Sequence, residues 1–200
     1  MQKRKRKNIF IHPVLLAAGG SKRLGYPKQL LKYKSKSLIS RSIYIANSIT
    51  SNPVSIIIGS NALKIRLAIK HQTNNSIIIF NRKWELGISE SLKISKKHIN
   101  PSAKAILILS CDQPFINNKH IDKLIEIWNK NKNKIVVAKY NNTFGIPLIL
   151  PKKLFYLLDM VTGDQGIKKI VKERKDLLKK VTINSAGIDI DTEEDKKKFL

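Results

Sequence analysis

The sequence contains one cysteine, Cys111, among its 200 residues. A single cysteine cannot form an internal disulfide, and it excludes both a zinc ribbon and a CxxC redox motif. Long apolar runs are also missing, since no stretch approaches the roughly 20 residues that are needed to span a bilayer. These absences predict a protein of the reducing cytoplasm that does not reside in a membrane.

Acidic residues are scarce as well: 14 Asp and Glu oppose 39 Lys and Arg, which gives a formal charge of +25. Such an excess is typical of proteins that bind nucleic acid or an anionic membrane. However, only seven of the 39 are Arg, the residue whose planar fork reads base edges. We interpret most of the charge as compositional drift, because Lys, Ile and Asn share AT-rich codons, and we expect no specific nucleic-acid partner. Attraction of a polyanionic small substrate is the other interpretation.

The N-terminal segment superficially resembles a secretory signal. Basic residues Met1–Lys7 precede the apolar run Ile9–Ala18, which is the order found in such signals. His12 and Pro13 interrupt this run, and cleavage at its end would remove the glycine-rich motif described below. We therefore expect no signal peptide and predict that residues 1–8 form a disordered basic extension.

Short β-branched runs alternate with longer amphipathic segments along the chain. This order is typical of βα units and predicts an α/β fold with a Rossmann-like, mainly parallel sheet flanked by helices. A proline cannot donate to a sheet ladder, so we start the first strand after Pro13. No repeat or Gly/Ser linker divides the chain, and its length suits one domain, residues 1–200. The expected strands are Val14–Ala17, Val54–Ile58, Ser76–Phe80, Ala105–Leu109, Lys134–Ala138, Gly145–Leu150 and Val181–Ile183, and the expected helices are Leu38–Ile49, Asn61–His71, Ser91–His98, Lys119–Asn131 and Gly166–Arg174.

The first expected strand leads into a glycine-rich loop. Gly19 and Gly20 follow the strand, and Arg23 and Lys28 stand at the far end of the loop. Small residues let backbone N–H groups approach a triphosphate closely, while the two cations neutralise its oxygens. The loop is not a Walker A motif, because Tyr26 stands where that motif needs Lys, and its glycine spacing fails the GxGxxG pattern. An ordinary turn at a strand exit is the alternative.

A carboxylate, Asp112, follows the apolar run Ala105–Leu109. Open α/β sheets bind ligands at the carboxyl ends of their strands, and Mg²⁺ takes carboxylate oxygens together with substrate phosphates. Asp112 is therefore a candidate Mg²⁺ ligand, with a turn or helix-capping aspartate as the alternative. For Cys111 we expect a packed thiol, because no base lies at a recognisable spacing to activate it.

Two further carboxylates, Asp189 and Asp191, lie near the C-terminus. They point to the same side if they sit at a strand end, and they can then complete a metal site with Asp112. Thr192 and Asp195 also have the spacing of a helix-capping pair, which predicts a final helix. The four histidines have no metal-binding spacing, so we assign them no such role.

Together these segments resemble the molybdenum cofactor cytidylyltransferase family, which is MobA-like, within the NTP-transferase domains. The resemblance runs nearly end to end and rests on the order and spacing of six motifs. They are the LAAGGSKRLG…K loop, Asn81-x-x-Trp84-x-x-Gly87-x-x-x-Ser91-Leu92, Asp112-Gln113-Pro114, Gly145-Ile146-Pro147, Gly163-Asp164-x-Gly166 and the terminal DIDT.

The resemblance implies an Mg²⁺-dependent enzyme that transfers a cytidylyl group from CTP to the molybdopterin cofactor and releases pyrophosphate. A molybdoenzyme or its chaperone would then receive the product. Catalysis of this kind depends on positioning and charge neutralisation rather than on a covalent intermediate. The implied catalytic residues are Arg23, Lys28 and Asp112, and the implied metal ligands are Asp112, Asp191 and Asp189. The implied nucleotide-binding residues are Ala17, Ala18, Gly19, Gly20, Ser21, Arg23, Lys28, Gly87 and Ser91, and those on the acceptor side are Gly145, Pro147 and Asp164.

Differences from related families favour cytidine and leave the acceptor open. Guanylyltransferases of the wider group usually read LAGG and carry Asp directly before the lysine, where this chain has Ala18 and Pro27. On the acceptor side, Ile146, Ile167 and Lys168 depart from the family pattern, as does Glu193. The alternatives are a GTP-dependent guanylyltransferase, a nucleotidyltransferase for a sugar phosphate or another phosphorylated acceptor, and, outside enzymes, a basic nucleic-acid-binding module.

Overall fold

The computed structural model describes residues 11–164, 166–167, 171 and 174–200. The predicted extension over residues 1–8 lies outside the described residues. So do residues 168–170 and 172–173 of the predicted helix Gly166–Arg174. Among the described residues, no helix is both long and apolar enough to cross a bilayer.

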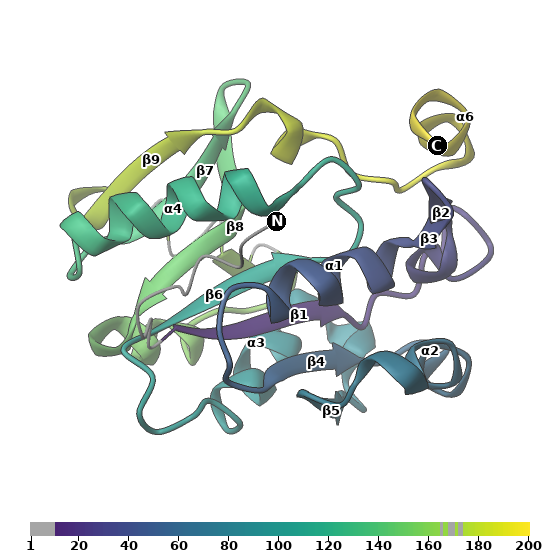
Figure 1. Ribbon diagram of the computed structural model, residues 1–200, viewed down its shortest axis with the longest axis horizontal. Helices are drawn as coiled ribbons and strands as arrows, with labels where there is room; N and C mark the ends of the chain where they lie inside the picture. The colour runs from purple at the N-terminus through teal and green to yellow at the C-terminus, as the bar shows by residue number, and fades with distance from the viewer. Residues whose placement is uncertain (1–10, 165, 168–170, 172–173) are drawn as a thin grey trace.

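A seven-stranded sheet forms the centre of the protein (Figure 1). All its strands run in one direction except β8, which is antiparallel to both of its neighbours. The prediction of an α/β fold with a mainly parallel sheet is confirmed. In spatial order the strands are β5 (Ser76–Phe80), β4 (Val54–Ile58), β1 (Ile11–Ala17), β6 (Ala105–Ser110), β8 (Thr143–Pro151), β7 (Ile135–Tyr140) and β9 (Leu178–Thr182).

Helices cover both faces of this sheet, and a small hairpin stands beside it. The hairpin consists of β2 (Lys32–Tyr33) and β3 (Lys36–Ser37), which the sequence did not predict. The α-helices are α1 (Leu38–Asn47), α2 (Ala62–Ile69), α3 (Ile88–Lys96), α4 (Asn118–Lys130) and α6 (Glu193–Phe199). The 3-10 turns are η1 (Lys28–Leu30), η2 (Lys70–Gln72), η3 (Trp84–Leu86), η4 (Lys152–Leu158), η5 (Lys175–Leu177) and η6 (Asn184–Gly187).

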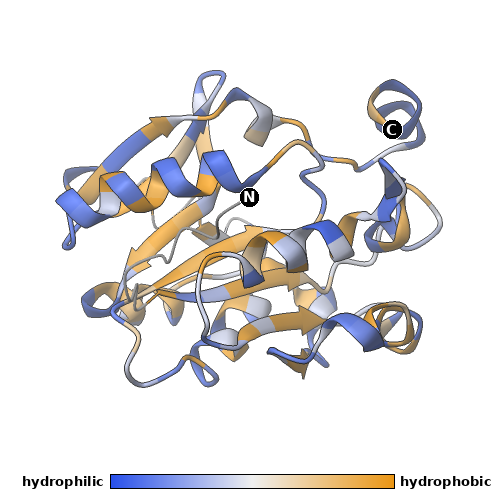
Figure 2. Ribbon diagram, viewed as in Figure 1, coloured by the Kyte–Doolittle hydropathy of each residue, from blue (hydrophilic) through white to orange (hydrophobic). Residues whose placement is uncertain are grey.

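The core consists of two layers, because successive side chains of a strand point to opposite faces of the sheet. Leu15 and Leu107 pack with α1, α2 and α4 on one face, and Trp128 of α4 is fully buried there. Leu16 and Ile108 pack with α3 and η4 on the other face. Figure 2 shows the same division, with apolar strands between helices that present hydrophilic residues to solvent.

The start of the first strand differs from the prediction. β1 begins at Ile11 and includes Pro13, which pairs with Leu107 of β6. On the other side, pairing with β4 begins only at Val14. The missing N–H of the proline is tolerated because Pro13 precedes the point where β1 has a neighbour on both sides.

The carboxyl ends of β1 and β6 meet the C-terminal segment at one edge of the sheet. Cys111 N–H, directly after β6, donates to Leu16 O over 3.3 Å, and Ile190 N–H donates to Asp112 O over 3.0 Å. Helix α6 then begins with the predicted capping box, in which Thr192 and Asp195 each accept from the other's backbone N–H. This edge brings three distant parts of the chain together.

Candidate active site

The glycine-rich loop after β1 is closed by its own hydrogen bonds. The carbonyl of Ser21 accepts from Leu24 N–H over 3.0 Å and from Gly25 N–H over 3.1 Å. The hydroxyl of Ser21 accepts from the backbone N–H of Lys28 over 3.1 Å. These bonds join the two ends of the loop and place Lys28 beside the strand exit.

Gln29 orients the loop from inside the protein. Its side chain is fully buried, and Nε2 donates to Ala17 O and Gly19 O, both over 2.9 Å. In a trans peptide the carbonyl and the following N–H point in opposite directions. The N–H groups of Ala18 and Gly20 are therefore turned away from Gln29, which is the orientation that phosphate binding requires. This role of Gln29 was not predicted from the sequence, where the signal was an amide between Lys28 and the apolar Leu30 and Leu31.

Lys28 forms the centre of the site. Its Nζ lies 2.6 Å from Asp112 Oδ2 and 2.6 Å from Asp191 Oδ1, and the lysine side chain is only 13% exposed. Burial opposes its charge, but the two carboxylates outweigh that effect and raise the pKa of Lys28. Arg23, which is largely exposed, reaches the second oxygen of Asp191 over 2.9 Å. The structure thus brings together the predicted Arg23, Lys28, Asp112 and Asp191.

The Asp112 loop is held by polar contacts on both sides. The Ser110 hydroxyl donates to the Asp112 carboxylate. Gln113 is buried, and its Nε2 donates to Ile146 O over 3.0 Å and to Ala186 O over 2.8 Å. One amide therefore links the loop after β6 to β8 and to η6. The sequence motif contained Gln113, but this linking role was not predicted.

Asp189 and Asp191 flank a buried residue. Ile190 is fully buried and packs with Leu24 and Leu38, so the two aspartates lie on the opposite side of this extended segment. The expected common side is thus present, although the segment is not a strand. Burial, together with the nearby charges of Asp112 and Asp191, raises the pKa of Asp189 to about 7. The site therefore concentrates more negative charge than Lys28 alone neutralises.

The carboxylates fit a divalent cation by their chemistry. Oxygen donors of this kind are what Mg²⁺ and similar hard cations prefer, and burial, followed by the charges of Asp112 and Asp191, raises the pKa of Asp189. Within the described ranges, no three His, Cys, Asp or Glu side chains form a ready-made metal site. Instead, the Lys28 ammonium occupies the space between Asp112 and Asp191.

A cavity of about 190 Å³ opens beside this cluster. Asp112 and Asp189 line one part of it, and the predicted acceptor-side residues Gly145 and Asp164 line another. Pro147 is buried and does not line this cavity. A Cβ at Gly145 would lie 2.5 Å from the Tyr140 hydroxyl, so glycine allows Tyr140 to pack against the backbone in this wall.

Two of the predicted nucleotide-binding residues, Gly87 and Ser91, pack against other parts of the protein. Gly87 has a φ of +98°, and a Cβ there would lie 2.5 Å from Asp164 Oδ1, so Gly87 packs directly on the Gly163–Asp164 turn. Ser91 is buried, and its hydroxyl accepts from Asn81 Nδ2 over 3.0 Å inside the protein. Ser91 therefore packs in the interior, where it is hydrogen-bonded to Asn81.

Trp84 covers the glycine-rich loop from the other side. A Cβ at Gly20 would lie 2.5 Å from the Trp84 ring, and one at Gly59 would lie 2.5 Å from Trp84 Cβ. The indole therefore packs on the bare backbone of both glycines.

Cys111 is buried as predicted, and burial followed by the charge of Asp112 raises its pKa to about 12. A thiol in that state is not a nucleophile.

The family described as the MobA-like NTP transferase domain matches residues 13–178. The chain belongs to this family. It is a nucleotidyltransferase, an enzyme with an NTP as substrate, as the resemblance implied. The matched region of this MobA-like domain includes Lys28 and Asp112 but ends before Asp189 and Asp191. These two carboxylates therefore come from outside the matched region.

Curated relatives of this MobA-like domain carry several different names. Nicotine blue oxidoreductase of Paenarthrobacter nicotinovorans is 25% identical over 198 residues, which cover 94% of this chain and 95% of that protein. A probable molybdenum cofactor guanylyltransferase of Methanocaldococcus jannaschii is 26% identical over 172 residues, 84% and 79% of the two chains. The bifunctional protein GlmU of Clostridioides difficile is 27% identical over 152 residues, and the match covers 74% of this chain but only 32% of GlmU.

Solved structures share the fold of this MobA-like domain. Rv0371c from Mycobacterium tuberculosis H37Rv superposes with a TM-score of 0.80 at 24% identity, covering 96% of this chain and 98% of that one. A complex of the same protein with manganese gives 0.77 at 23% identity, with 95% and 97% covered. A nucleotidyl transferase from Methanothermobacter thermautotroptrophicus gives 0.79 at 17% identity, with 94% of each chain covered.

Proposed function

We propose that this nucleotidyltransferase transfers a cytidylyl group from CTP to the terminal phosphate of the molybdopterin cofactor. The observation that carries the transfer chemistry is the position of Lys28, held between Asp112 and Asp191 at the mouth of the glycine-rich loop. In the reaction, an oxygen of the acceptor phosphate attacks the α-phosphorus of CTP. The bond from that phosphorus to the β-phosphate oxygen breaks, and pyrophosphate leaves with the electron pair.

The glycine-rich loop binds the triphosphate in this proposal. Because Gln29 holds the carbonyls of Ala17 and Gly19 inward, the N–H groups of Ala18 and Gly20 are presented before the nucleotide arrives. Arg23, exposed at the loop, pairs with β- or γ-phosphate oxygens. Preorganised donors of this kind stabilise charge without reorganisation during the reaction.

Lys28 neutralises charge at the α-phosphate. In the structure its ammonium is shared by two carboxylates, which keep it charged at the mouth of the loop. When the same carboxylates hold a cation, this pairing would be replaced and the ammonium would be free to face the phosphate. Asp112, Asp191 and Asp189 would hold a divalent cation, for which we propose Mg²⁺; when bound, that cation supplies positive charge to the carboxylates and to the phosphate oxygens. A manganese complex of a protein with the same fold supports a divalent cation here.

The cavity beside Asp112 receives the phosphorylated end of the acceptor. Its volume of about 190 Å³ suits the phosphate and its neighbouring atoms, and Gly145 and Asp164 lie in its wall. A relative named as a probable molybdenum cofactor guanylyltransferase supports molybdopterin as the acceptor. Cytidine is favoured by Ala18 in the loop and by Pro27 before Lys28.

The test is a panel that measures pyrophosphate release with CTP, GTP, ATP and UTP and with purified molybdenum cofactor or sugar phosphates as acceptors. We expect CTP with molybdenum cofactor to be at least about a hundredfold better than GTP, because a pocket that pairs with one base leaves polar groups unpaired against another. A dominant guanine dinucleotide product contradicts the choice of base. Turnover only with a sugar phosphate or another acceptor contradicts the choice of molybdopterin, and salt-sensitive DNA binding that survives Asp112→Ala would indicate the binding module instead.

A further inference from the structure

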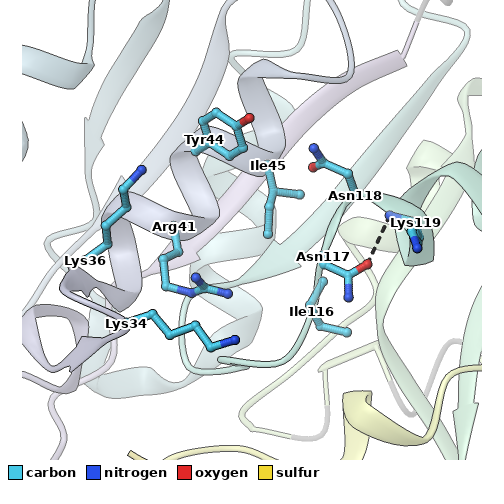
Figure 3. Close-up of a pocket in the computed structure, with 9 residues that line it drawn as sticks. All are labelled: Lys34, Lys36, Arg41, Tyr44, Ile45, Ile116, Asn117, Asn118 and Lys119. Atoms are coloured by element: carbon cyan, nitrogen blue, oxygen red, sulfur yellow. Dashed lines mark hydrogen bonds between the residues drawn. The ribbon is translucent and has the colours of Figure 1, made fainter. Parts of the chain in front are cut away.

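A second cavity lies on the face of the sheet that α1 and α4 cover, and its described lining residues include none of the glycine-rich loop. It has a volume of about 500 Å³ and lies between the β2–β3 hairpin, α1 and the start of α4 (Figure 3). Four cations line it, Lys34, Lys36, Arg41 and Lys119, together with Asn117. The described residues that line it include no carboxylate. This volume lies within the range of small-molecule sites.

Within the described part of the chain, no carboxylate pairs with the cations of this cavity, which we call the basic cavity. Across residues 11–164, 166–167, 171 and 174–200, none of its four cations forms an ion pair with a carboxylate. Helix α4 begins at its wall and has no acidic residue in its first turn, so the positive end of the helix dipole adds to the same field. Like charges gathered around one space repel each other, and an anion in that space removes the repulsion.

Three of the cations contact an aromatic ring before any ligand binds, and Lys34 Nζ lies 5.4 Å from the centre of the Tyr33 ring. Arg41 Nη2 donates to Pro114 O over 3.0 Å, and its guanidinium lies 4.8 Å from the centre of the Tyr33 ring. Lys36 Nζ lies 5.5 Å from the centre of the Tyr44 ring. Figure 3 shows Lys34 and Arg41 both extending toward the segment that carries Ile116 and Asn117. Cations that are already ordered lose less entropy on binding an anion.

We propose that this basic cavity binds an oligophosphate, as a second anion site separate from the glycine-rich loop. Several cations around one open cavity match a ligand with several negative charges close together, and Asn117 and Asn118 add amide groups that can donate to phosphate oxygens. The ring of Tyr44 is 63% exposed at the rim and offers a flat surface to a base if the oligophosphate belongs to a nucleotide.

The basic cavity is connected to the Asp112 loop through Arg41. Arg41 donates to the carbonyl of Pro114, two residues after Asp112. Phe115 packs edge-on against Tyr33, with ring centres 5.3 Å apart, and Tyr33 is the ring on which Arg41 stacks. An anion that engages Arg41 therefore acts on the segment that begins at Asp112.

The test measures tripolyphosphate binding by titration calorimetry at 150 mM salt without divalent cations. An Arg23→Ala/Lys28→Ala variant removes the two cations that we assign to triphosphate binding at the glycine-rich loop, and tripolyphosphate should still bind it at one site. Adding Lys34→Gln and Lys36→Gln to that variant should weaken binding at least about tenfold, the loss expected for two charge-assisted contacts. Far-ultraviolet circular dichroism checks that each variant is folded.

The control variant carries Lys64→Gln and Lys70→Gln on the same background. Both lysines are exposed and lie outside this cavity, so the same loss of net charge should weaken binding less than about twofold if the cavity is the site. Equal weakening by the two pairs, or no binding to Arg23→Ala/Lys28→Ala, overturns the proposal. If the Arg23→Ala/Lys28→Ala variant binds tripolyphosphate and CTP with equal affinity, the cavity recognises the phosphate chain alone. If this variant binds CTP more tightly, the ligand of the cavity is a nucleotide. If wild type also binds only one tripolyphosphate, the cavity stands and the proposed triphosphate site at the loop is wrong.

Discussion

Replacing Gln29 by leucine removes two hydrogen bonds from the interior while it keeps the side-chain volume nearly constant. The carbonyls of Ala17 and Gly19 lose their donor. Ala17 is buried, so its unsatisfied carbonyl costs about 1–3 kcal/mol, whereas Gly19 is exposed and water can replace its donor. Part of this cost is offset, because Gln29 Oε1 is itself buried without a partner among the described atoms, and leucine removes it. We expect a net loss of about 2 kcal/mol in the free energy of unfolding, measured by urea denaturation.

Gln29→Leu should impair catalysis as well as folding. Once the two carbonyls are free to turn, the N–H groups of Ala18 and Gly20 are no longer held toward the triphosphate, and we expect kcat/KM for the NTP to fall about tenfold to a hundredfold. The assay is pyrophosphate release per folded molecule. Ile125→Ala in α4 is the control, because Ile125 is a buried core residue and its truncation costs about 2–4 kcal/mol without touching the loop. Full turnover of folded Gln29→Leu would refute the orienting role.

Three further predictions concern the carboxylate cluster and the core. Lys28→Ala should lower kcat about 10²–10³-fold in the pyrophosphate assay, the usual scale for removing one preorganised charge from a transition state, and unchanged turnover would remove Lys28 from the mechanism. Asp112→Asn should abolish divalent-cation-dependent turnover while circular dichroism remains that of the wild type; loss of the fold would show that Asp112 is structural. Burial lowers the pKa of His12 from 6.5 to about 4, so between these values the unfolded chain binds a proton that the folded protein does not. Stability should therefore decrease as pH falls through this window, by up to about 3 kcal/mol, and urea titrations at pH 4.5 and 7.5 should show a smaller decrease for His12→Gln than for the wild type.

Local patterns predicted the strands well where apolar β-branched residues dominate. Val54–Ile58 and Ser76–Phe80 have the predicted bounds, because nearly every residue in them favours an extended chain. β1 is longer than predicted, since the rule against proline in a strand applies only where the missing N–H has a partner. Helix α3 begins at Ile88, three residues earlier than expected, directly after the positive-φ turn at Gly87.

The site was predicted as a set of residues but not as an arrangement. Lys28 is 84 residues from Asp112 and 163 residues from Asp191, and no spacing rule gives a distance between side chains so far apart in sequence. Family motifs identified these positions, whereas the lysine's place between the two carboxylates needed the structure. Gln29 was missed because its one signal, an amide beside Leu30 and Leu31, does not show which backbone groups it contacts. Ser91 was predicted to bind the nucleotide, but it is buried and its hydrogen bond to Asn81 is internal.

The late position of Asp191 has a consequence for biosynthesis. Strands β1, β4, β5 and β6, with the glycine-rich loop, are complete once the ribosome has released residue 112, but the second carboxylate beside Lys28 arrives 79 residues later. Until then, an emerging chain can form the loop and still lacks half of the cluster around that lysine. We therefore expect the nascent protein to acquire its complete set of charges, and with it any affinity for a divalent cation at this cluster, only when synthesis has passed residue 191.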